Sequence, residues 1–261
     1  MYDIFTSPRT TLSCNDARSG FSLVELSIVL LIIGMLVSGV LVGRDMIRAA
    51  ELRSIVTDKD RIQTAVNLFQ QKYLGLPGDL INATSFWGPM TNCTTTASGT
   101  GTQTCNGNGD GMIGWGNTSG YSYEMLSFWQ HLSNSGLIEG KYTGVWSGTS
   151  GSANQELAGK IKNTTWSSFF FGNIVLANTN WFEGQYGNVL NLFLGNLSPV
   201  LISPSEMWNI DKKIDDGLPG LGNVVSGESN ANCNTTTIAS TAEYNLIYTE
   251  NACAPAFKKI W

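Results

Sequence analysis

The sequence has few charged residues and a single histidine. Only 13% of its residues are charged and the net charge is −5, which argues against a nucleic-acid-binding surface. The only histidine is His131 and no two cysteines have C-x-x-C spacing, so the common zinc ligand sets are missing. No P-loop sequence occurs, and no G-x-G-x-x-G stands between a predicted strand and a predicted helix as a dinucleotide fingerprint requires. We therefore expect a structural or interaction protein rather than an enzyme, with no nucleic acid among its partners.

Proline is missing from a long stretch near the N-terminus. None occurs from Phe21 to Leu74, and the stretch ends at Gly75-Leu-Pro-Gly-Asp79, a strong helix stop. These residues predict one helix about 80 Å long. Its first part is apolar all round, which suits lipid or the centre of a helical bundle. Its second part keeps one apolar face, as expected of a helix lying against a sheet, at Leu52, Val56, Ile62, Val66, Phe69 and Tyr73.

One carboxylate, Glu25, lies at the start of the apolar part. The 18 residues from Leu26 to Gly43 carry no charge, which is about the minimum for crossing a bilayer. A charge at the bilayer centre costs roughly 2.5–3.5 kcal/mol on insertion scales. No Lys or Arg lies within one helical turn on the C-terminal side of Glu25. We therefore expect its partner to be supplied from elsewhere.

Three glycines interrupt the apolar part, at Gly34, Gly39 and Gly43. Each weakens the helix by about 1 kcal/mol relative to Ala. Small residues permit close packing between membrane helices. Local melting, when the chain leaves the bilayer, is the other interpretation.

A conventional secretory signal does not fit the order of residues. Such a signal has an apolar core of about 7–15 residues followed by small residues at the cleavage site. Here Arg18, Ser19 and Gly20 precede the apolar run, so a cut after Gly20 leaves the helix on the mature chain. A plain membrane anchor would explain the run but not Glu25.

The run Gly20-Phe-Ser-Leu-Val-Glu25-Leu, continued by apolar residues, resembles the N-terminus of type IV pilins and of the pseudopilins of type II secretion. The resemblance is strong over residues 18–74 and loose beyond. It implies that a prepilin peptidase cuts between Gly20 and Phe21 and that the new N-terminal Phe21 is methylated. It also implies that Glu25 docks the subunit onto the growing filament. The implied partners are other pilin-like subunits, an inner-membrane assembly platform and membrane lipid.

The resemblance also implies an α+β fold, in which the long helix packs on a small antiparallel-sheet head with short extra helices. The predicted segments are a leader (1–20), a transmembrane and assembly helix (21–43), the amphipathic half of the same helix (44–74) and a globular periplasmic head (75–261). The chain would cross the inner membrane once with its head in the periplasm. The assembled filament would be periplasmic or extracellular.

Five cysteines divide into Cys14 in the leader and four in the mature chain. An even set in a chain carried across a membrane indicates disulfides in an oxidising compartment. Four cysteines allow three connectivities. We expect Cys93–Cys105 and Cys233–Cys253, because both close short loops. A cysteine pair that brackets the C-terminal section also resembles the disulfide-bounded region of many pilin heads.

A Gly- and Asn-rich loop after the helix resembles the first half of an EF-hand calcium loop. Asn117 stands where a bidentate Glu is expected, so binding would be weak unless Glu124 or another acid folds in. A plain Gly- and Asn-rich turn is the alternative. The residues that would supply calcium ligands are Asn106, Asn108, Asp110 and, through its carbonyl, Met112.

Further patterns predict short elements in the head. Helices are expected at Tyr123–Ser135 and from Ser203 to about Lys213, the second with a capping box. Alternating or clustered apolar residues between turn signals predict strands at Trp166–Ala177, Asn188–Leu197 and Tyr244–Thr249. We expect His131 to be a surface or packing residue, and most of the eight Trp and eight Tyr to lie in the core.

Two functions fit these observations. The first is a structural subunit of a type IV pilus-like or type II secretion pseudopilus filament, a major or a minor one. The second is a membrane-anchored minor or tip protein that acts as an adhesin or glycan-binding module, with exposed Trp and Tyr lining a groove. Surface pilus, secretion pseudopilus and DNA-uptake fibre remain alternatives.

Overall fold

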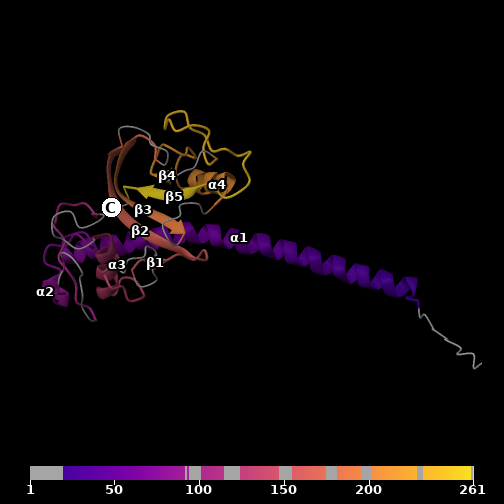
Figure 1. The fold of residues 1–261 in the computed structure, drawn as a ribbon, viewed down its shortest axis with the longest axis horizontal. Coiled ribbons are helices and arrows are strands. Elements are labelled where there is room, and N and C mark those ends of the chain that lie inside the picture. Colours follow the sequence, from indigo (N-terminus) through magenta and orange to yellow (C-terminus); the bar gives the residue numbers. More distant parts are fainter. Residues whose placement is uncertain are drawn as a thin grey trace, which may run out of the picture. The chain divides into compact units, whose positions relative to one another are not determined.

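The structure is a computed structural model that describes residues 20–91, 93, 101–114, 124–146, 155–174, 181–194, 202–227, 232–259 and 261. The leader before Gly20, with Cys14, and Asn117 of the predicted calcium loop lie outside these residues. The chain divides into two compact units, Met1–Arg48 and Ala49–Trp261, and each is described by itself. Helix α1 (Leu23–Tyr73) contributes its first part to the N-terminal unit and the rest to the C-terminal unit (Figure 1).

Helix α1 runs for 51 residues and follows the predicted bounds closely. It ends at Leu74, whose φ of 57° is the left-handed conformation in which many helices terminate. The Leu74 N–H donates to the carbonyl of Gln70 at 2.9 Å, and Gly75 and Pro77 follow. In the C-terminal unit the helix buries one face, which consists of Ile55, Asp58, Ile62, Ala65, Val66 and Phe69.

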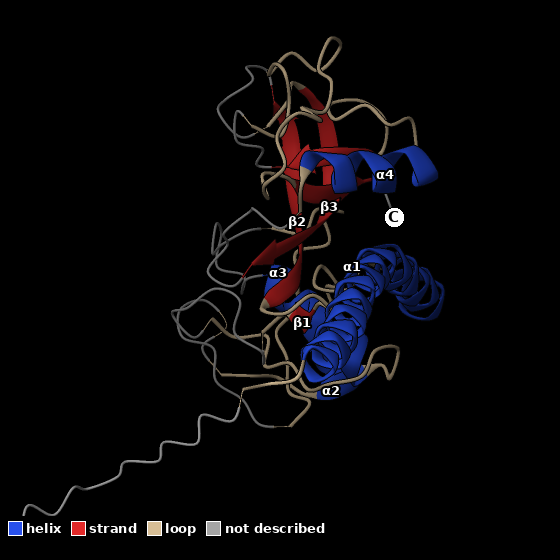
Figure 2. Ribbon diagram, turned by 90° about the vertical axis from the view of Figure 1, so that its right-hand side faces the viewer, coloured by secondary structure: helices blue, strands red, loops and turns tan. Residues whose placement is uncertain are grey.

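A five-stranded antiparallel sheet forms the centre of the C-terminal unit (Figures 1 and 2). The long hairpin partners β2 (Thr164–Ile174) and β3 (Gly184–Leu194) pair along most of their length, with Phe169 opposite Val189. The strand order is β1-β2-β3-β5-β4. The remaining strands are short: β1 (Leu157–Ala158), β4 (Val224–Gly227) and β5 (Ala254–Lys258). The structure thus has the expected α+β fold.

The two faces of the sheet are buried in separate clusters. One face packs with the second part of α1 and with helices α3 (Glu124–Asn134) and α4 (Pro204–Ile214), and its side chains include Trp166, Leu190, Leu192, Val224 and Phe257. The opposite face forms a smaller cluster that includes Phe169, Val189, Phe193, Val225 and Ala256. Alternation along each strand explains the division, since successive side chains point to opposite faces.

The helices of the head follow the predicted patterns. Helix α4 begins at its predicted capping box: Ser203 Oγ accepts from the Glu206 N–H, and Glu206 Oε2 accepts from the Ser203 N–H at 2.9 Å. Helix α3 lies within the predicted bounds, but it is buried on all sides from Glu124 to Leu132 rather than on one face. A further single turn, α2 (Thr84–Trp87), was not predicted.

The prediction of a last strand at Tyr244–Thr249 is wrong. This segment forms turns, in which the Leu246 N–H donates to the Tyr244 carbonyl and the Tyr248 N–H to the Asn245 carbonyl. Within the described residues its one ladder contact is an isolated bridge between Tyr244 and Asn234, and Leu246 and Ile247 face solvent instead of a partner strand. The last strand is β5, which was not predicted and which contains Pro255, a residue that is unfavourable inside a sheet. Pro255 is paired with β4 alone, so the N–H that proline lacks is not needed by β3.

Candidate functional site

The N-terminus of α1 is closed by a variant of the capping box between Ser22 and Glu25, in which the serine hydroxyl accepts from the second helical residue, Val24, instead of the third. Ser22 Oγ accepts from the Val24 N–H at 3.2 Å, and Glu25 Oε2 accepts from the Ser22 N–H at 2.8 Å. These reciprocal bonds satisfy donors that a helix start leaves free. Glu25 therefore has a local hydrogen-bond partner, which the expectation of a wholly external partner missed. The S-x-x-E pattern of residues 22–25 was the available signal.

The same capping box fixes where the carboxylate points. Because Glu25 reaches back to Ser22, its charge lies beside the residue that follows Phe21. Phe21 itself is 91% exposed. Its side chain and the Glu25 carboxylate are thus both presented at the start of the helix, where a second chain can reach them. The Ser22 N–H is neutral, and no ion pair of Glu25 occurs among the described residues, so its negative charge stays uncompensated there.

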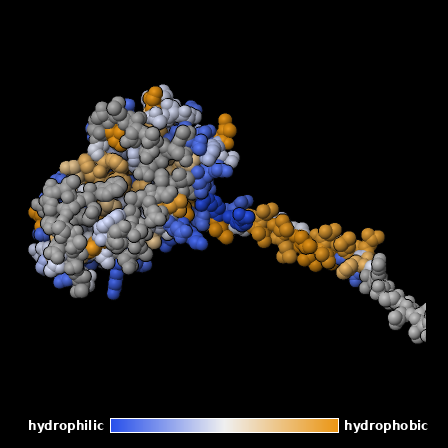
Figure 3. Space-filling model, in the orientation of Figure 1, coloured by the Kyte–Doolittle hydropathy of each residue, from blue (hydrophilic) through white to orange (hydrophobic). Residues whose placement is uncertain are grey.

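The first part of α1 exposes its apolar side chains all round, and Figure 3 shows one side of this apolar surface. All the large apolar residues from Phe21 to Ile47 are exposed, and the most apolar 18-residue window of the helix has a mean hydropathy of 2.7 with none of it buried. By length and composition this helix can cross a membrane. A surface of this kind is unstable in water and needs lipid or other helices around it.

The three glycines of this segment face open space within the described part of the chain. A Cβ added at Gly34, Gly39 or Gly43 would meet no atom within 4 Å. Their small size is therefore not explained by packing inside one copy. Close helix approach between copies and local melting both remain open as interpretations.

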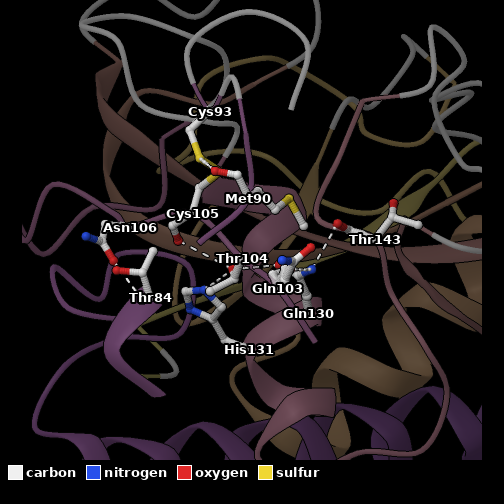
Figure 4. Close-up of a disulfide and its surroundings, with 10 residues drawn as sticks. All are labelled: Thr84, Met90, Cys93, Gln103, Thr104, Cys105, Asn106, Gln130, His131 and Thr143. Atoms are coloured by element: carbon white, nitrogen blue, oxygen red, sulfur yellow. Dashed lines mark hydrogen bonds between the residues drawn. A yellow bond between two sulfur atoms is a disulfide. The ribbon is translucent and has the colours of Figure 1, made fainter. Parts of the chain in front are cut away.

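Both predicted disulfides are present. Cys93 pairs with Cys105 and Cys233 pairs with Cys253, over sequence separations of 12 and 20 residues. The second is fully buried, and it closes the segment that precedes β5. The first closes a loop beside α3 (Figure 4).

His131 lies at the centre of a buried hydrogen-bond chain next to the first disulfide (Figure 4). The Gly78 N–H donates to Nδ1 at 2.9 Å, so the ring proton is on Nε2. Nε2 donates to Thr104 Oγ1 at 2.9 Å, and the Thr104 hydroxyl donates to Gln130 Oε1 at 2.6 Å. Burial lowers the pKa of His131 to about 3, which keeps the ring neutral.

The chain continues from Gln130 and ties several segments together. Gln130 Nε2 donates to the carbonyls of Gln103 and Thr143 at 2.8 and 3.0 Å. The imidazole also stacks on the ring of Phe69 at 6.2 Å between centroids and contacts the tilted ring of Trp87 at 5.1 Å. His131 is thus a packing residue, as expected, and it joins α1, α2, α3 and the disulfide loop.

The residues predicted to bind calcium are engaged with the backbone of the loop and of α2. Asn106 Oδ1 accepts from the Thr84 N–H at 2.9 Å, at the start of α2. Asn108 Oδ1 accepts from the Asp110 N–H at 2.9 Å, and Asp110 Oδ1 accepts from the Met112 N–H at 2.8 Å. These bonds shape the turn that was the alternative interpretation, and they direct Asn106 toward α2. Calcium binding by this motif stays a prediction.

Two carboxylates from outside the motif meet Asp110. Oxygen atoms of Asp79, Asp110 and Glu124 lie within 4.8 Å of one another. Burial raises the pKa of Asp79 and of Glu124, and hydrogen bonds from the loop backbone oppose that rise. The sequence named Glu124 as an acid that could fold in but did not indicate Asp79. The donors to these two carboxylates are the N–H groups of Asn108, Gly109, Gly111 and Gly114.

Comparison with known proteins bears on the N-terminal segment. Residues 15–41 match the family model described as the prokaryotic N-terminal methylation motif. The match includes Gly20, Phe21, Glu25 and most of the apolar part of α1. Searches of the curated proteins and of the solved structures found no match to the chain.

Proposed function

We propose that this chain is a structural subunit of a type IV pilus-like or type II secretion pseudopilus filament and not an enzyme. The proposal starts from the type IV pilin-like prepilin leader that the family match supports. The observation that carries the proposal is the fully exposed apolar part of α1 headed by the single charge of Glu25. Such a helix is stable in lipid before assembly and among sister helices after it.

Assembly would use the two residues at the head of the helix. Cleavage between Gly20 and Phe21 would give Phe21 a free and then methylated amino group, which is cationic. Glu25 of one copy would pair with the Phe21 amino group of its neighbour, and this pairing would offset the cost of burying each charge. The capping box supports the pairing, because it holds the carboxylate at the end of the helix where the amino group is created.

The proposed location is the inner membrane, crossed once, with the C-terminal unit in the periplasm. The two disulfides support this orientation, since such bonds persist in oxidising compartments. The partners would be a prepilin peptidase, the assembly platform of the inner membrane, membrane lipid and other pilin-like subunits.

The alternative, a tip adhesin or glycan-binding module, needs exposed aromatic residues in a groove. The groove between α1 and α4 and the groove at the end of α1 contain no Trp or Tyr. Among the described residues, Trp129 and Trp166 are fully buried and Trp181 lies in the smaller core cluster, whereas Trp146 is 38% exposed. The filament subunit stays the first proposal because the exposed apolar part of α1 and Glu25 support it directly.

The test separates the charge of Glu25 from its capping role. Glu25→Gln keeps an oxygen acceptor for the Ser22 N–H but removes the charge, while Ser22→Ala keeps the charge but removes the hydroxyl of the cap. We expect Glu25→Gln and Glu25→Ala to be cleaved normally yet to fall at least about tenfold in sheared filaments. Ser22→Ala should assemble. Normal incorporation of Glu25→Gln would contradict the proposal, and gold labelling confined to fibre tips would favour the adhesin.

A further inference from the structure

A groove runs between two helices of the C-terminal unit. Its cavity volume is about 640 Å³, within the range of about 300–1,000 Å³ typical of ligand pockets. Each helix presents residues at spacings of three and four, which is one helical face. The lining residues are Ala49, Leu52, Arg53, Val56 and Thr57 of α1 and Glu206, Asn209, Ile210, Lys213 and Ile214 of α4.

The groove combines an apolar floor with a positive rim. Leu52, Val56 and Ile214 pack only partly against the core, so apolar surface is left in the groove. Arg53 and Lys213 are exposed, and neither forms an ion pair within the described part of the chain. The one acid in the lining, Glu206, holds the helix cap. A suitable occupant would therefore be an apolar segment flanked by carboxylates.

Such a segment is exposed elsewhere on the same unit, at Glu243–Glu250, and we term it the knob. Leu246 is 51% and Ile247 is 92% exposed at its tip, while exposed Glu243 and Glu250 flank them. The turn is held by the Leu246–Tyr244 and Tyr248–Asn245 backbone bonds. The disulfide Cys233–Cys253 closes the surrounding loop. The knob is thus a preorganised apolar surface with two negative charges.

The base of the knob is fixed on a different side of α4 from the groove. Tyr244 donates its hydroxyl proton to Asp211 Oδ2 at 2.8 Å. Asp211 does not line the groove and lies about 100° around the helix from Ile210, which does. The knob and the groove are therefore separate surfaces of one head, and a second copy can supply the knob that a groove receives.

We propose that the knob of one copy docks in the α1–α4 groove of the next, with Leu246 and Ile247 against the apolar floor and Glu243 and Glu250 near Arg53 and Lys213. This inference rests on the proposed filament function, and it specifies which surfaces of neighbouring heads would meet in the filament. Because the two surfaces differ, the contact is heterologous, and heterologous contacts that do not close into a ring produce open helical arrays.

Crosslinking between two forms of the full chain, each with one added cysteine, tests the contact. Cells would produce one copy with Asn209→Cys in the groove and another with Ile247→Cys at the knob, and a short bismaleimide would join them without disturbing the native disulfides. We expect a crosslinked dimer from this mixture. The matched control replaces Ile247→Cys by Ile238→Cys, which is 58% exposed in the same disulfide loop but outside the knob. The control should give about tenfold less dimer.

Charge reversal provides the second arm. Adding Glu243→Lys to the Ile247→Cys copy should reduce the dimer yield about tenfold, and adding Lys213→Glu to the Asn209→Cys copy should restore it. A yield no higher than the Ile238→Cys control, or one indifferent to both charge changes, overturns the contact. If filaments still form in that case, the filament function stands without it. A specific dimer from cells that form no filaments supports the contact and contradicts the filament function.

Discussion

At the scale of single residues, burial decides what the ionisable groups of this protein do. His131 lies in the core with both ring nitrogens hydrogen-bonded, so it is held neutral with its proton on Nε2. Asp211 is also fully buried, and burial raises its pKa to about 7. The two groups have opposite linkage to pH, since one releases a proton on folding and the other takes one up.

His131 makes the protein less stable in acid. Its folded pKa of about 3 lies below its ordinary value of 6.5, so the unfolded chain binds the proton that the folded chain refuses. The stability from this group is fully present above pH 6.5 and is lost as the pH falls toward 3, by up to about 1.4 kcal/mol per pH unit. Asp211 acts oppositely, because its contribution is present below its ordinary pKa of 3.8 and lost as the pH rises through about 7.

The contribution of His131 to the pH dependence of stability is isolated by comparison with His131→Gln, because glutamine has no side-chain group that titrates. Urea unfolding of the full chain in detergent would be measured for both proteins between pH 4 and pH 7. We expect the free-energy difference between wild type and variant to shrink as the pH falls. A difference that is constant across this range would show that His131 does not lose its proton on folding.

At the scale of elements, the helix ends and the disulfides hold the short elements of the head. The capping box of α4 and the C-terminal turn of α1 at Leu74 set where two helices begin and end. Two disulfides then fix the loops beside α3 and before β5. These local devices matter because β1, β4, β5 and α2 are each five residues or fewer.

The α4 cap can be tested at Ser203. Ser203→Ala removes the acceptor for the Glu206 N–H, and we expect it to lower the free energy of unfolding by about 1 kcal/mol. Ser203→Asp, which retains a capping oxygen, serves as the control and should cost less. Equal losses in the two variants, measured by urea unfolding, would mean that the hydroxyl hydrogen bond contributes little.

The two disulfides should differ in their reactivity toward reductant. Cys233 and Cys253 are fully buried, whereas Cys93 is only half-buried. Exposed disulfides are attacked more readily by external thiols. We therefore expect dithiothreitol to open Cys93–Cys105 first in the folded protein, as mapped by timed alkylation and mass spectrometry. In denaturant the two should open at similar rates, and an earlier opening of Cys233–Cys253 in the folded protein would contradict the burial argument.

At the scale of the whole molecule, the sequence predicts features that local chemistry determines. The absence of proline up to Leu74, the Gly75–Asp79 stop and the S-x-x-E of α4 each specify an element without distant contacts. Features set by distant contacts were missed. Asp79 meets the Asn106–Met112 loop only in the folded chain, and Pro255 is tolerated in β5 only because β3 does not pair with it.

The knob also shows the difference between features set by local chemistry and features set by distant contacts. The apolar residues of Tyr244–Thr249 predicted a strand, but within the described residues only Tyr244 forms a bridge, to Asn234, and the tip of the segment is left in solvent. At the N-terminus the sequence predicts an assembly role for Glu25, and its local bond to Ser22 could have been predicted from the S-x-x-E of residues 22–25. Whether a charged or apolar side chain finds its partner within the chain or on another copy depends on the assembled fold.

The central claim is that an apolar helix, freed at its N-terminus by a single cut, carries the chain into a filament. Mass spectrometry of the native protein recovered from sheared filaments tests it most directly. The account predicts a mature chain that begins at Phe21 with one added methyl group on its amino terminus. A chain that keeps residues before Phe21, or one that begins beyond Gly43, would contradict it.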